Sequence, residues 1–157
     1  MGAEMRNLTR DFTIPAALPL LPAKMDSPEA RAMLLAIAGQ ETDFRHRVQV
    51  VGPAIGLWQF ERPTVALVLN HAVIGAMAKA ACEALLYAPE AALVHAAMAD
   101  NDVLACVFAR LLLWPDPHQL PGKSEQYEGW RYYLRCWRPG KPHVATWGDN
   151  WRLAWRS

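Results

Sequence analysis

The sequence SPEARAMLLAIAGQETDF (residues 27–44) contains the clearest helix signal in the chain. Ser27 is a good N-cap, Pro28 suits the first helical position, and Glu29 complements the positive end of the helix dipole. The apolar residues that follow recur at the three- and four-residue spacing of one helix face. We therefore expect a helix over residues 27–41 with one apolar stripe in a hydrophobic core. The stripe consists of Ala30, Met33, Leu34, Ile37 and Ala38.

Glu41 continues this apolar stripe at the end of the predicted helix. A carboxyl on a core-facing stripe is partly desolvated, and it also lies at the negative end of the helix dipole. Both effects raise its pKa, as a general acid at neutral pH requires. The basic residues Arg45, His46 and Arg47 would lower the pKa if they came close. The alternative is an ordinary helix-end glutamate that is solvated or paired with an arginine.

A loop segment with two glycines, GPAIGLWQFERP, begins at Gly52. Gly52 and Gly56 permit tight turns or the close approach of a ligand. Trp58 offers a flat face on which a sugar ring could stack, and Gln59 offers both a donor and an acceptor. Alternatively, Trp58 and its apolar neighbours anchor the loop in the core. We expect residues 47–60 to form an irregular loop or a small β-hairpin.

The remaining periodicity predicts a mainly α protein with a single domain over residues 27–157. Residues 1–26 contain three prolines in TIPAALPLLPAK, so we expect a non-helical arm whose leucines pack onto the domain. Ser124 is the expected cap of the helix that starts there. The further helices are expected at about 64–72, 75–87, 89–99, 101–114, 124–137 and 147–155.

The composition fits one globular domain, because the chain has 157 residues and about 100–200 are typical of a domain. The chain is 53% hydrophobic, 20% charged and carries a net charge of +1, which argues against nucleic acid as its partner. No run of about 18 apolar residues predicts a membrane span. The charged residues Glu4, Arg6, Arg10 and Asp11 interrupt any signal-peptide core.

The cysteines and histidines are scattered and show no metal-ligand spacing such as CxxC or HExxH. We therefore expect no metal and no cofactor. We expect buried or free thiols in a protein made in a reducing cytoplasm. The residues are Cys82, Cys106 and Cys136, and His46, His71, His95, His118 and His143.

Five of the seven tryptophans lie between residues 130 and 155, and the last 36 residues carry seven Lys or Arg against three acids. Three functional interpretations are a sugar-stacking flank that binds an anionic wall, a groove for single-stranded nucleic acid, and a membrane-active tail. Aromatic stripes at helical spacing are mostly core, so burial against the domain is the favoured interpretation.

Two motifs, AIAGQETDF (36–44) and AIGLWQF (54–60), resemble the lysozyme-like superfamily in the branch of the soluble lytic transglycosylases. That family shows a helix ending in Glu-Ser-x-Phe, followed by a loop with Gly-Leu-Met-Gln. The longer stretch over 40–61 is similar to small lysozyme-like proteins of tailed phages and prophages. The matching residues are Glu41, Thr42 and Phe44, with Thr for Ser, and then Gly56, Leu57 and Gln59, with Trp58 for Met.

The resemblance implies a lysozyme-like fold, with Glu41 as the catalytic acid and base and Gln59 in the saccharide cleft. Asn101 matches a later family helix, through NDVLACVFARLLL. The family's Ala-Tyr-Asn-Ala-Gly motif is missing, and the candidates to replace its tyrosine are Tyr127, Tyr132 and Tyr133. The expected substrate-binding residues are Thr42, Gly56, Trp58, Gln59, Glu61, Asn101 and Tyr127.

The expected function is cleavage of the MurNAc–GlcNAc bond of peptidoglycan by a phage-associated glycosidase. Glycosidases usually need two carboxylates, about 5 Å apart for retention of configuration. Asp43 points to another helix face than Glu41, whereas Glu61 could approach from across the loop. As the family implies, a lytic transglycosylase needs one Glu, because the N-acetyl group of the substrate assists and a 1,6-anhydro product forms.

Two alternatives stay open: a muramidase with Glu61 as second carboxylate, and a catalytically inactive virion protein on a lysozyme-like scaffold. The expected partners are peptidoglycan glycan strands and other phage virion proteins. We expect synthesis in the bacterial host cytoplasm without a signal peptide. The protein would then reach the virion, or the periplasm and cell wall.

Overall fold

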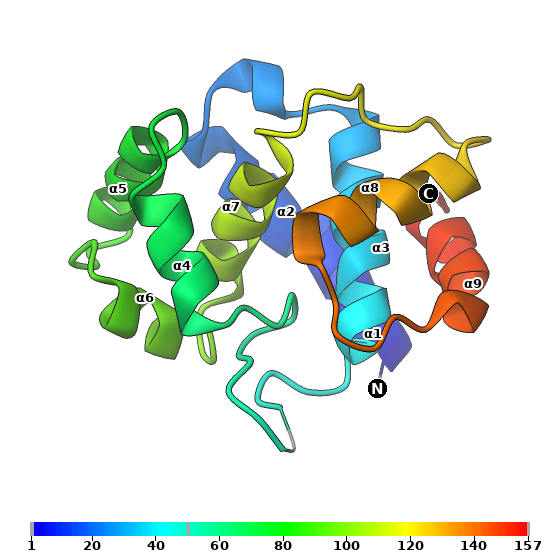
Figure 1. Cartoon of the computed structure of the whole chain (residues 1–157), viewed down its shortest axis with the longest axis horizontal. Helices are drawn as coiled ribbons and strands as arrows, with labels where there is room; N and C mark the ends of the chain where they lie inside the picture. The colour runs from blue at the N-terminus through cyan, green and yellow to red at the C-terminus, as the bar shows by residue number, and fades with distance from the viewer. Residues whose placement is uncertain (1, 50, 157) are drawn as a thin grey trace.

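The computed structural model describes residues 2–49 and 51–156, and these residues are mostly helical (Figure 1). They contain no strand, and isolated antiparallel bridges join Ile55 to Val48 and to Phe60. The predicted mainly α class is confirmed. The helices are α1 (Gly2–Leu8), α2 (Ile14–Ala17), α3 (Pro28–Thr42), α4 (Arg62–Leu69), α5 (Gly75–Ala84), α6 (Ala91–Ala97), α7 (Asp102–Leu113), α8 (Gln126–Trp137) and α9 (Val144–Ala154).

Helix α3 is the predicted helix of residues 27–41, and it lies in the middle of the core. The Ser27 hydroxyl caps it by accepting a hydrogen bond from the Ala30 amide at 3.0 Å. Ala30 and the rest of the predicted stripe are buried, but so are residues on other faces, such as Leu35 and Ala36. The burial is broader than one stripe because α3 packs against both α7 and α9.

The helices form two groups with α7 between them (Figure 1). Helices α4, α5 and α6 gather on one side, while α3, α8 and α9 gather on the other. The packing agrees, since α4 contacts α5 and α6, and α3 and α8 both contact α9. Residues 43–61 form the loop that joins the groups, and this loop adjoins the site described below. The ends of the helices from α4 onward lie within three residues of their predicted positions.

The N-terminal segment is helical, so the prediction of a non-helical arm was wrong. Helix α1 continues through a π-helical turn (Thr9–Thr13) into α2 and then into a 3₁₀ turn (Leu18–Leu20). Pro15 and Pro19 are the second residues of α2 and of this 3₁₀ turn, and Pro22 precedes another 3₁₀ turn (Ala23–Met25). Leu18 and Leu21 pack into the same core cluster as α3, as expected for the leucines.

The C-terminal aromatic residues are mainly core, which confirms the favoured interpretation for Trp130, Trp147 and Trp151. The ring of Trp147 stacks on that of Tyr133 at 5.4 Å between centroids and 12° between planes. The predicted Ser124 cap was wrong, because α8 starts at Gln126, its N-cap residue is Glu125, and it has no side-chain cap. The three cysteines are free thiols. Within residues 2–49 and 51–156, no helix is both long and apolar enough to cross a bilayer.

Candidate active site

A cleft of about 960 Å³ opens beside the C-terminal end of α3. Glu41 lines it from α3, Gln59 and Glu61 line it from the loop, and Leu67 lines it from α4. The end of α8, including Tyr133, and the segment 138–143 complete the wall. The fold thus brings Glu41, Gln59 and Glu61, all predicted site residues, to one cavity.

The Glu41 carboxyl is mostly buried, and this burial raises its pKa from the ordinary 4.5 to about 7. The charged form is disfavoured because the carboxyl has left water and pairs with no cation of the described residues. A hydrogen bond from the Tyr133 hydroxyl to Glu41 Oε1, 3.3 Å long, partly opposes this rise by stabilising the carboxylate. Near neutral pH the carboxyl therefore exists in both protonation states, which lets it donate and accept a proton in turn.

The arginines close to Glu41 in sequence do not neutralise it. Arg45 pairs with Asp43 at 2.7 Å, and Arg47 pairs with Asp102 at 2.7 Å. Asp43 is the C-cap of α3 in the left-handed conformation, and its carboxylate is paired with Arg45. The alternative of an arginine-paired glutamate at the helix end therefore does not apply to Glu41 within the described residues.

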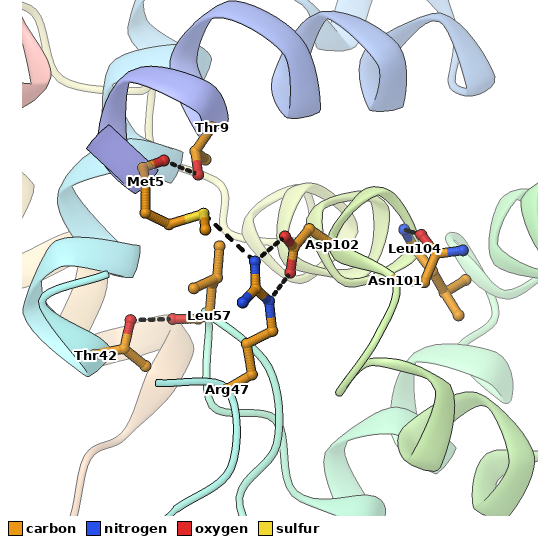
Figure 2. Close-up of polar contacts among 8 residues, drawn as sticks. All are labelled: Met5, Thr9, Thr42, Arg47, Leu57, Asn101, Asp102 and Leu104. Atoms are coloured by element: carbon orange, nitrogen blue, oxygen red, sulfur yellow. Dashed lines mark hydrogen bonds and ion pairs between the residues drawn. The ribbon is translucent and has the colours of Figure 1, made fainter. Parts of the chain in front are cut away.

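Thr42 joins the end of α3 to the loop rather than lining the cleft. Its buried hydroxyl lies 2.9 Å from the Ala38 carbonyl oxygen. It also lies 3.1 Å from the Leu57 carbonyl oxygen, a contact drawn in Figure 2. Gly56 has a φ of +87°, and a Cβ there would meet the Met98 carbonyl oxygen at 3.2 Å. Both residues therefore set the path of the loop that carries Gln59 and Glu61, and they are positioning residues.

A second contact anchors the start of the loop to α7. Figure 2 shows the Arg47 guanidinium between the Met5 sulfur and the Asp102 carboxylate. Arg47 Nε and Nη2 donate to the two Asp102 oxygens at 2.8 and 2.7 Å, in a bidentate ion pair. Met5 Sδ lies 3.4 Å from Nη2, so the N-terminal helix α1 also contributes to this contact.

Arg47→Met is expected to lower the free energy of unfolding by about 1–3 kcal/mol, because it leaves the partly buried Asp102 carboxylate unpaired. Hydrogen exchange of the amides in residues 43–61 should accelerate as well. Arg45→Met is the matched control, since its ion pair with Asp43 is 72% and 65% exposed. That variant should change stability by less than about 1 kcal/mol. Equal effects of the two variants in denaturant titrations would contradict the assigned anchoring role of Arg47.

Besides Thr42 and Gly56, three predicted binding residues lie outside the cleft lining. Trp58 is fully buried and donates its indole N–H to the Leu34 carbonyl at 2.9 Å, so its predicted sugar-stacking role is wrong. Asn101 caps α7 by accepting from the Leu104 amide at 3.0 Å (Figure 2). Tyr127 is 65% exposed in the first turns of α8, away from the cleft residues.

The sequence offered Tyr127, Tyr132 and Tyr133 as candidates for the tyrosine of the cleft, without choosing among them. Tyr132 is buried and donates to the Leu113 carbonyl at 2.9 Å, which leaves Tyr133 as the tyrosine at Glu41. Burial and the neighbouring carboxyl raise the Tyr133 pKa, so its hydroxyl stays a donor. The pairing joins residues 92 positions apart, and only the stripe of aromatic residues at Trp130, Tyr133 and Trp137 hints at it.

Wild-type stability is expected to fall relative to that of Glu41→Gln as the pH rises from 4.5 to about 7. The folded carboxyl keeps a proton that the unfolded chain releases in this window, so folding favours the protonated form. This stabilisation is complete below the pKa of Glu41 in the unfolded chain and is lost above its pKa in the folded protein. It contributes at most about 3 kcal/mol to the free energy of unfolding. Denaturant titrations of both proteins across this range measure it, and parallel pH dependences would refute a raised pKa at Glu41.

No group of three or more His, Cys, Asp or Glu side chains that could hold a metal ion occurs in the part of the chain that the structure describes. No protein-family model, curated protein or solved structure matches this chain. The likeness to lytic transglycosylases through residues 36–44 and 54–60 therefore stays a prediction. A function has to be inferred from the cleft and its residues.

Proposed function

We propose that this protein is a peptidoglycan-cleaving glycosidase of the lytic transglycosylase type, with Glu41 as general acid and then general base. The observation that carries the proposal is the state of Glu41. Its carboxyl has a pKa of about 7, lines a cleft of about 960 Å³, and has no arginine or lysine partner among the described residues. A protonated carboxyl in a cleft is the group that departure of a sugar leaving group requires.

The chemistry that the resemblance implies needs one ionisable group at the scissile bond. Glu41 protonates the glycosidic oxygen, the N-acetyl group of the substrate assists, and a 1,6-anhydro product forms. A pKa close to the working pH serves both the donation and the later recovery of the proton. Tyr133 orients the carboxyl through its hydrogen bond to Oε1. Gln59 lines the same cleft and provides an amide for the glycan hydroxyl and acetamido groups.

A muramidase is the second candidate, and the position of Glu61 favours it. Glu61 lines the same cleft as Glu41, is exposed, and precedes the first turn of α4. A second carboxylate there would serve a hydrolase as nucleophile or as base for water. The two enzymes differ in their products, because the hydrolase adds one water to each cleaved bond.

The inactive-scaffold alternative is less well supported than either enzyme. A site that has lost catalysis would be expected to show a closed cleft or a glutamate neutralised by an arginine. Glu41 instead lies on an open cleft without a cation partner in the described chain. Phage association and delivery to the virion, periplasm or cell wall are part of the same proposal and rest on the motifs of residues 36–61.

Mass analysis of soluble fragments released from purified peptidoglycan tests the proposal. Fragments lighter by one water than hydrolysis products are expected from the folded protein. Fragments with reducing ends would instead establish the muramidase. If folded protein releases no fragments from several wall types, the enzyme proposal fails and the scaffold alternative takes its place.

A further inference from the structure

The segment 138–143 gives one wall of the cleft a positive charge. Arg138, Lys141 and His143 are all exposed, and all line the cleft. Neither Arg138 nor Lys141 forms an ion pair with a carboxylate in residues 2–49 and 51–156. This wall therefore carries two cations that the described protein does not neutralise, although the whole chain has a net charge of only +1.

Other charges in the cleft do not cancel these cations. Asp116 is paired with Arg135 at 2.8 Å and with His118 at 2.7 Å. Glu61 belongs to the loop before α4, and it forms no ion pair with Arg138 or Lys141 in the described chain. The positive potential is thus concentrated along the segment that follows α8, where it can attract anionic groups of a ligand.

Contacts at both ends hold this segment next to Glu41. At its start, Trp137 Nε1 donates to the Trp58 carbonyl at 3.0 Å. At its end, the His143 carbonyl accepts from Gln40 Nε2 at 2.8 Å and from Thr146 Oγ1 at 3.0 Å. Gln40 directly precedes Glu41, and two prolines restrict the backbone between the anchors. Arg138 and Lys141 therefore lie on a segment that is held in place at both ends, beside the candidate general acid Glu41.

We infer that Arg138 and Lys141 bind the free carboxylates of the peptide stems that hang from the glycan strand. This inference rests on the proposed function, and it names the part of the substrate that the charged wall of the cleft recognises. The sugars of the strand are uncharged, so they give an unpaired cation no ionic partner. The stems carry carboxylates and begin on the muramyl residue next to the scissile bond, which brings them to the wall beside Glu41. Exposed contacts of this kind contribute modestly each and weaken with salt.

The test compares two substrates made from one teichoic-acid-free peptidoglycan: intact strands, and amidated strands whose stem carboxylates have been converted to neutral amides with a carbodiimide and ammonia. The variant Arg138→Gln/Lys141→Gln removes both cations. The matched control Arg131→Gln/Lys79→Gln removes one exposed Arg and one exposed Lys outside the cleft lining. Circular dichroism verifies that each protein is folded. The readout is the ratio of kcat/KM on intact strands to kcat/KM on amidated strands.

Wild type and control should share a ratio well above one, and the cleft variant should lower it by about fivefold at low salt. High salt should lower the wild-type ratio toward that of the variant. An equal loss on both substrates would overturn the inference while leaving the proposed function intact. A third substrate, amidated strands prepared with their teichoic acid retained, tests binding to phosphates: a loss by the cleft variant on this substrate alone would assign the cations to phosphates and also overturn the inference. No cleavage of either substrate by folded wild type would overturn both proposals.

Discussion

Replacing Glu41 by Gln is expected to slow peptidoglycan cleavage by about 10²–10⁴-fold, the usual contribution of a general acid or base. Gln preserves the size of the side chain and an oxygen that can accept the Tyr133 hydrogen bond. It has no proton that titrates near neutral pH. The loss should therefore appear in kcat, with little change in the affinity for glycan strands. Fragment release and far-UV circular dichroism on the same preparation measure rate and folding together.

Two matched variants sharpen this result. Asp43→Asn changes a neighbouring carboxyl whose side chain is 65% exposed and paired with Arg45, and it should leave the rate almost unchanged. Glu61→Gln distinguishes the two enzymes, because a transglycosylase should keep most of its rate and a muramidase should lose it. Full activity in folded Glu41→Gln would remove Glu41 from the mechanism and with it the proposed function.

Trp58→Ala is expected to lower the free energy of unfolding by about 3–5 kcal/mol, which is a large part of the stability of a domain of this size. The Trp58 ring is fully buried, and its N–H is hydrogen-bonded to the Leu34 carbonyl inside α3. Removal leaves a cavity and deletes this hydrogen bond. Denaturant titration followed by circular dichroism measures the change.

Tyr127→Ala is the control, because Tyr127 is the predicted binding aromatic that the structure leaves 65% exposed. Its effect on stability should stay within about 0.5 kcal/mol. If Trp58→Ala were as stable as wild type but bound glycan poorly, the core assignment would be wrong and the sugar-stacking interpretation would return.

Local sequence patterns predicted the features that depend on neighbouring residues. The Ser27 cap, the course of α3 and the burial of the stripe before Glu41 follow from helical periodicity. The same periodicity placed Glu41 at a partly desolvated helix end, where its pKa is raised. It also predicted buried tryptophans in α9, where Trp147 and Trp151 fall one turn apart. In each case the sequence pattern that gives the prediction lies within a few turns of one helix.

The other features of the fold and the site depend on contacts between segments that are distant in the sequence. The spacing of residues along the chain carries no information about such contacts. From the sequence alone, Trp58 could have faced either a bound sugar or the core. In the structure its indole N–H donates to the Leu34 carbonyl of α3, which places the ring in the core. Tyr133 joined Glu41 only through the packing of α8 near α3. Residues 2–20 became helical because burial of Ile14 and Leu18 against the core outweighs the local cost of their prolines. Hydrophobic patterning along the chain can determine where each helix lies in the sequence. The surfaces that surround a given side chain form only when the helices pack together.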